Sequence, residues 1–163
     1  MLMTLSPLAG CAEDTTSPSG TQSEVEALSF QDQLIASYDR FMTTGGSEYV
    51  YSGGDNYILS YQPDGDVAAL YNESFDDVIG IEEKQMMTLV LAKTMLDDSA
   101  TEVTEITDGL ELRNPNLGAI AVHFADGYLT SYEALEDTWH GTISYEIDQK
   151  VIDMLLTKIA NGE

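Results

Sequence analysis

The spacing of apolar side chains predicts three helices. After Ser29, a favourable helix N-cap, apolar residues recur every three and four positions up to a glycine pair at 45–46, where we expect the helix to end. A second apolar segment covers residues 82–97, and its apolar positions run most of the way round a helical cylinder, which indicates burial on more than one side. A third helix is predicted over residues 148–160, with its aliphatic side chains on one side.

Between these helices the pattern changes to short runs that are rich in β-branched and aromatic residues and bounded by turn sequences. Asp108-Gly109 and Asp126-Gly127 are strong signals for tight hairpins. In the last run, Trp139, Gly141, Ile143, Tyr145 and Ile147 alternate with polar residues and are expected on one face. The predicted strands cover residues 48–52, 56–61, 67–71, 101–107, 110–113, 117–124, 128–133 and 139–147.

This order of elements predicts an α+β fold. Hairpin turns between neighbouring strands imply an antiparallel sheet, which we expect to have about six to eight strands and helices packed on one face. The chain has 163 residues, of which 43% are hydrophobic. We therefore expect a single domain over residues 25–163, large enough to fold around one core.

The amino-terminal residues Leu8-Ala9-Gly10-Cys11 resemble the cleavage and lipidation signal of bacterial lipoproteins. The resemblance implies that residues 1–10 are a signal peptide and that Cys11, the one cysteine of the sequence, becomes the acylated first residue. The apolar run before Cys11 is short and contains no Lys or Arg, which indicates a signal truncated at its start. Residues 12–24 are polar and contain Pro and Gly, a composition typical of a disordered tether.

The charge of the chain restricts its partners. Six Lys and Arg residues stand against 29 Asp and Glu, which gives a formal net charge of −23. Such a surface repels the phosphates of nucleic acids and anionic lipid headgroups, so we expect no nucleic-acid partner. Attachment through the lipid on Cys11 would place the protein on the extracytoplasmic face of a bacterial cell membrane.

Several local sequences resemble actinobacterial lipoproteins of the LppX/LprG type, which are related in fold to the periplasmic lipoprotein carrier LolA. They are Thr43-Thr44-Gly45-Gly46, the run at 122–129 and the run at 143–147. The resemblance implies a half-barrel whose concave face is covered by helices, with an apolar cavity that holds a lipid or an acyl chain. This chain is shorter than that type and ends in a helix instead of a strand.

The methionine-rich middle helix carries the candidate ligand-binding residues. Met86, Met87, Val90 and Leu91 would form an adaptable wall around an apolar ligand, although plain core packing explains the same residues. The function expected is that of a lipid-anchored protein that binds or carries a lipid or another apolar molecule. The alternative is a non-catalytic envelope module that binds another protein through its acidic surface.

The chain offers little that indicates an enzyme. His123 and His140, the two histidines, lie on strand positions opposite the large apolar residues, where surface positions are expected, and there is no G-x-S-x-G nucleophile motif. The acidic pair Asp64 and Asp66 does not continue as a calcium-binding loop, since residue 68 is Ala. We therefore expect no catalytic activity, no metal and no cofactor.

Overall fold

The computed structural model describes residues 27–82 and 87–163, and these residues form an α+β fold with one curved, open antiparallel sheet. Cys11 and the other residues of the lipoprotein signal lie outside the described part. The elements in chain order are α2 (Phe30–Thr44), β1 (Gly46–Ser52), β2 (Asp55–Gln62), β3 (Val67–Asn72), β4 (Asp77–Gly80), α3 (Thr88–Asp97), β5 (Glu102–Ile106), β6 (Gly109–Asn114), β7 (Gly118–Ala125), β8 (Tyr128–Ala134), β9 (His140–Ser144) and α4 (Gln149–Ala160).

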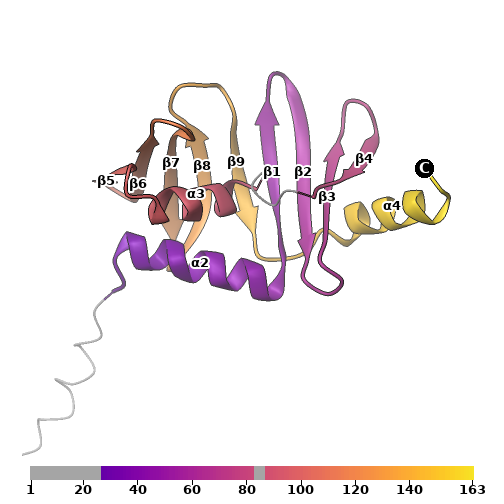
Figure 1. Ribbon diagram of the computed structural model, residues 1–163, viewed down its shortest axis with the longest axis horizontal. Coiled ribbons are helices and arrows are strands. Elements are labelled where there is room, and N and C mark those ends of the chain that lie inside the picture. The colour runs from indigo at the N-terminus through magenta and orange to yellow at the C-terminus, as the bar shows by residue number, and fades with distance from the viewer. Residues whose placement is uncertain (1–26, 83–86) are drawn as a thin grey trace, which may run out of the picture.

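The sheet consists of two meanders joined in the middle. Its nine strands lie in the order β4-β3-β2-β1-β9-β8-β7-β6-β5, and β1 pairs antiparallel with β9, so strands from the two ends of the chain lie side by side (Figure 1). The register brings Glu48 opposite Ile143 and Tyr51 opposite His140. Because this pairing links segments about ninety residues apart, only the folded sheet brings them together.

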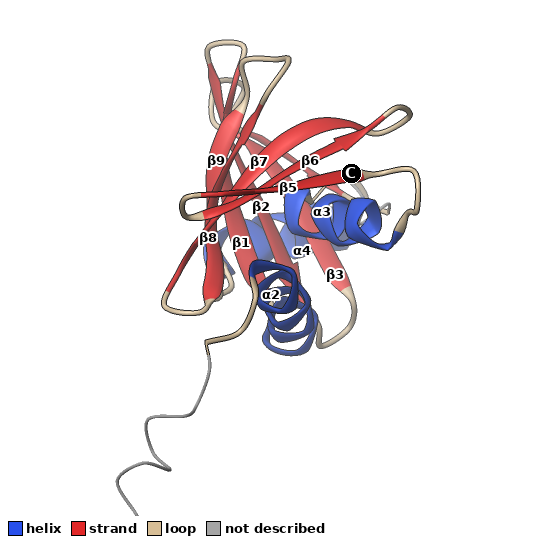
Figure 2. Ribbon diagram, turned by 90° about the vertical axis from the view of Figure 1, so that its left-hand side faces the viewer, coloured by secondary structure: helices blue, strands red, loops and turns tan. Residues whose placement is uncertain are grey.

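The main core lies between the sheet and two helices, α2 and α3. We call this the inner face of the sheet, and it is the hollow side around which the strands curve (Figure 2). Leu34 and Phe41 of α2, with Leu89 and Met95 of α3, have no exposed surface. They meet alternate residues of the strands, such as Leu112 and Val122.

Helix α4 packs on the opposite, outer face, which corrects the expectation that the helices share one face. Along β3, Ala68 and Leu70 belong to the main core, whereas Ala69 and its alternate neighbours pack against α4. Val151 and Ile152 of α4 are buried there, each worth about 2 kcal/mol of transfer free energy. The physical reason is that β3 is apolar on both sides, so each face needs a cover.

The chain reaches the outer face at the end of β9. This strand stops at Ser144, and Ile147 packs in the cluster under α4, so the predicted alternation on one face holds for Trp139, Gly141, Ile143 and Tyr145 but is wrong for Ile147. The backbone N–H of Asp148 donates to the hydroxyls of Ser47 and Ser60, both at 2.8 Å. These buried serines fix the point at which α4 begins.

The number of strands was underestimated because β4 was not predicted. Its four residues include Gly80 and an exposed Ile79, and so carry a weak strand signal. The middle helix begins at Thr88 rather than at 82, and residues 83–86 lie outside the described part. Among the described residues, no helix is long and apolar enough to cross a bilayer.

Candidate functional site

An apolar pocket of about 270 Å³ lies on the inner face, between the sheet and α3; we call it the inner pocket. Strands β1, β2 and β3 form its floor, and α3 forms one wall. Ser52, Tyr57 and Thr88 contribute its polar groups. The lining residues are Val50, Ser52, Tyr57, Leu59, Leu70, Thr88, Leu91 and Trp139.

The four predicted ligand-binding residues do not all reach this pocket. Leu91 lines it, whereas Met87 has no exposed surface and belongs to the core. Val90 is half-buried and packs against the same core. Met86 lies outside the described residues. Of the three predicted side chains that the structure describes, Leu91 therefore lies on the cavity and the other two do not.

Glu48 binds the N-terminal end of α3, the helix that forms one wall of the pocket. Its carboxylate, which has no exposed surface, accepts the backbone N–H groups of Thr88 and Leu89, each at 3.0 Å. Met87, at the N-cap position of α3, supplies no side-chain cap. A carboxyl group from β1 therefore satisfies the first donors of α3 and lies at the positive end of the helix dipole.

The surroundings of Glu48 change its protonation. Burial raises the pKa of the carboxyl group, while the backbone donors of Thr88 and Leu89 and the Tyr132 hydroxyl, 3.1 Å away, oppose that rise. Burial, together with the negative charge of Glu48, also raises the pKa of Tyr132. The tyrosine therefore stays a neutral donor to the carboxyl group.

Tyr132 reaches Glu48 because β9 has a glycine in its path. A Cβ atom on Gly141 would lie 2.5 Å from the Tyr132 hydroxyl oxygen and 2.6 Å from the backbone oxygen of Tyr49. The role of Glu48 was not predicted from the sequence. One feature of the sequence could have indicated it: residue 48 is acidic, although it lies on the same side of a predicted strand as the apolar Val50.

A second, larger hollow of about 630 Å³ lies on the outer face; we call it the outer groove. It crosses β2, β1, β9, β8 and β7, beyond the area that α4 covers. Asp148, the N-cap of α4, contacts the Tyr49 hydroxyl at 3.4 Å at the edge of this groove. The lining residues are Tyr49, Val50, Tyr51, Asn56, Tyr57, Ile58, Glu73, His123, Ser131, Tyr132, Glu133, His140, Gly141 and Thr142, of which Val50 and Tyr57 also line the inner pocket.

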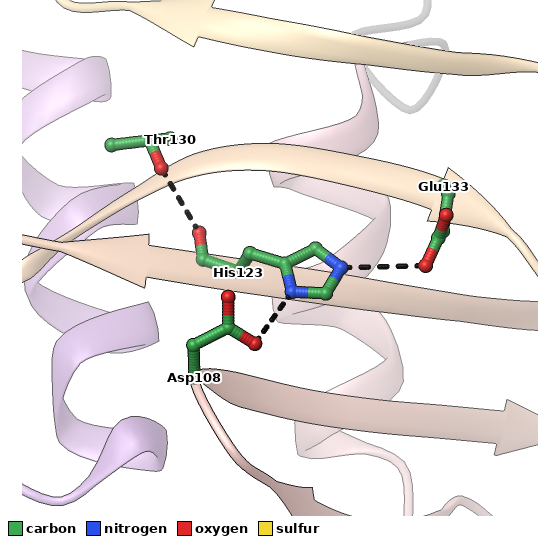
Figure 3. Close-up of polar contacts among 4 residues, drawn as sticks. All are labelled: Asp108, His123, Thr130 and Glu133. Carbon is green, nitrogen blue, oxygen red and sulfur yellow. Dashed lines mark hydrogen bonds and ion pairs between the residues drawn. The ribbon is translucent and has the colours of Figure 1, made fainter.

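His123 lies between the carboxylate of Glu133, which lines the groove, and that of Asp108. Its Nδ1 is 2.9 Å from Asp108 Oδ1, and its Nε2 is 3.4 Å from Glu133 Oε1 (Figure 3). The bond from His123 lowers the pKa of Asp108. A neutral imidazole carries one N–H, so both contacts are hydrogen bonds only when the ring is protonated. A Ser-His-Asp triad differs, since one ring nitrogen there accepts from a serine.

The sheet brings the two histidines to one site. His140 is paired with Tyr51 on one side and Glu133 on the other, and His123 is paired with Ser131. The prediction that they lie on the face opposite the apolar residues is confirmed, but their common groove was not foreseen. In the described part of the chain, His, Cys, Asp and Glu side chains do not gather in threes that could hold a metal ion.

No protein-family model matches this sequence, and no curated protein matches it significantly. The geometry of the two hollows is therefore the basis for assigning a function.

Proposed function

We propose that this protein is a lipid-anchored extracytoplasmic protein that binds a small apolar ligand in the inner pocket. The observation that carries the proposal is the pocket itself, a 270 Å³ space between the sheet and α3 with mostly apolar walls. Concave, mainly apolar sites with a few polar groups are typical of ligand binding. The Cys11 signal supports attachment to the membrane.

The volume restricts the ligand. At about 30 Å³ for each water-sized group, the pocket accommodates on the order of nine such groups. That capacity fits one short acyl chain or one ring system, and two long acyl chains would not both lie inside the pocket. The proposal is thus narrower than the lipid carriage implied by the resemblance to the LppX/LprG type.

Native mass spectrometry tests ligand binding. The full chain with Cys11→Ala, which cannot be lipidated, is purified gently from a bacterial host and measured before and after organic extraction. We expect a discrete small adduct that extraction removes. Leu91→Trp fills the pocket and should abolish the adduct, while Leu156→Trp, at a position 43% exposed on α4, should retain it.

Two results would contradict the pocket as the site. One is an adduct of the same mass on Leu91→Trp, and the other is a bare protein mass for every variant. Circular dichroism of both tryptophan variants establishes that they are folded. The anchor has a separate test, since the unsubstituted chain expressed with a complete signal should enter the membrane fraction and Cys11→Ala should not.

A bare protein mass would favour the alternative, a module that binds another protein. A specific surface supports it, because Ile79 of β4 and Leu156 and Ile159 of α4 are 48%, 43% and 60% exposed. Ile79 and Ile159 line a hollow of about 500 Å³ at this end of the sheet. Exposed apolar surface of this kind is typical of protein contacts.

A further inference from the structure

We propose that the outer groove binds an organic cation, a small molecule that carries an amine, amidine or guanidinium group. The groove lies on the other side of the sheet from the inner pocket, so this proposal stands whether or not an apolar ligand binds there. Three features of the groove support it: its aromatic wall, its charge and the position of His123.

The aromatic wall is formed by tyrosines that remain open to solvent. Tyr49 and Tyr51 are 42% and 43% exposed, although they are large side chains in the middle of a sheet. The ring centres of Tyr51 and His140 lie 5.3 Å apart, so the Tyr51 ring packs beside the imidazole. Exposed aromatic faces attract cations through the negative charge density of the ring.

Elsewhere in the molecule, tyrosines already hold a cation in this way. The guanidinium carbon of Arg40 lies 4.5 Å from the ring centre of Tyr128 and 4.6 Å from that of Tyr145. The outer groove also offers two tyrosines, Tyr49 and Tyr51, which lie on one strand. In the described part of the chain, its lining includes no Lys or Arg to occupy that place.

The charge of the groove favours a cation over an anion. Glu73 and Glu133 line it, and Asp108 lies beside His123 at its edge. The whole chain adds a formal net charge of −23. Clefts lined by one sign of charge concentrate ligands of the opposite sign. An anionic ligand would meet these carboxylates without a Lys or Arg among the lining side chains that the structure describes.

His123 leaves one carboxylate available to such a ligand. When its ring is neutral, the single N–H pairs with one carboxylate, and the other faces a lone pair. The contact with Glu133 is the longer one, 3.4 Å against 2.9 Å for Asp108, and Glu133 lines the groove whereas Asp108 does not. Glu133 is therefore the carboxylate that we assign to the ligand; Figure 3 shows it at the Nε2 side of the His123 ring.

Two probes of similar shape, one charged and one neutral, distinguish recognition of charge from recognition of shape. Benzamidine is a flat cation, and benzamide is its neutral counterpart. Each is titrated into the isotopically labelled Cys11→Ala chain at neutral pH and moderate salt, and amide shifts are followed by NMR. We expect benzamidine to shift the amides of Tyr51, Glu133 and His140 with saturation, and to bind at least about fivefold more tightly than benzamide.

Matched variants identify the groups. Tyr51→Leu and Glu133→Gln should each weaken benzamidine binding by about three- to tenfold, whereas Tyr51→Phe keeps the aromatic face and should retain it. Glu102→Gln removes an exposed acid on β5, outside the groove, and should have no effect. The amide spectrum of each variant shows directly whether it is folded.

The proposal is overturned if benzamide binds as tightly as benzamidine, which would assign the groove to uncharged ligands. It is also overturned if the benzamidine shifts spread over the acidic surface without saturation, since that is general charge attraction. Absence of any shift at millimolar concentration would refute it as well.

Discussion

Replacing Glu48 by Gln should destabilise the protein through the start of α3. Each carboxylate oxygen now accepts one buried backbone N–H. A Gln side chain keeps one acceptor and turns an NH₂ group toward the other donor, so one buried N–H loses its partner. The unpaired buried N–H and the lost hydrogen bond to Glu48 together should lower the free energy of unfolding by about 2–4 kcal/mol.

The pH dependence of stability gives a second measurement on the same variant. Burial raises the pKa of Glu48 above its ordinary 4.5, so at a pH between that value and the folded pKa the folded protein retains a proton that the unfolded chain has released. The contribution of Glu48 to the stability of the folded protein is fully present below pH 4.5 and is lost as the pH rises through its folded pKa. In urea titrations, the advantage of the wild type over Glu48→Gln should therefore shrink as the pH rises from 4.5.

Two controls bracket the effect. Tyr132→Phe removes one hydrogen bond to Glu48 and should cost about 1 kcal/mol, while Glu102→Gln, at an exposed position, should stay within about 0.5 kcal/mol of the wild type. The reasoning would be refuted if Glu48→Gln were as stable as Glu102→Gln. A wild-type advantage that grows with pH would refute the assigned direction of the pKa shift.

Two further predictions concern packing and acid sensitivity. Gly141→Ala should lower the free energy of unfolding by about 2–3 kcal/mol in urea denaturation, because the added Cβ would lie 2.5 Å from the Tyr132 hydroxyl oxygen. Gly80→Ala is the control, since its Cβ would meet Leu155 at 3.8 Å and should leave the stability nearly unchanged. Equal losses of stability in the two variants would contradict this account. The contact with Lys158 lowers the pKa of Asp77 below its ordinary 3.8. The stability that this pair adds to the folded protein is therefore present above pH 3.8 and is lost as the pH falls through the folded pKa of Asp77. Lys158→Met should reduce the drop in melting temperature between neutral and acidic pH, and an unchanged drop would show that the pair contributes nothing.

Part of the candidate site was accessible from the sequence. The apolar character of the middle helix predicted a wall for an apolar pocket, and Leu91 lies there. Glu48 was not identified, because an acidic residue in a strand is ordinarily solvent-exposed, and its partners at 88, 89 and 132 lie far along the chain. The outer groove was likewise not identified, although both of its histidines were considered.

The sequence by itself determined the two ends of α2, the hairpin turn at 126–127 and the α+β class of the fold. Ser29 caps α2 by accepting the N–H of Asp32, and Gly45, at a φ of 82°, ends it. Asp126 and Gly127 have φ values of 54° and 87°, as the predicted tight hairpin requires. These outcomes depend on backbone preferences within a few residues, which single positions can express.

Only the tertiary structure decided the pairing of β1 with β9, the side on which α4 packs and the residues that meet in each hollow. The pairing of Tyr51 with His140 joins segments about ninety residues apart, and no local preference encodes that choice. The run at 67–71 is apolar without interruption, and in the folded chain the main core covers one of its faces and α4 covers the other. Burial of both faces favours this arrangement, because it removes the apolar surface of α4 and β3 from water together.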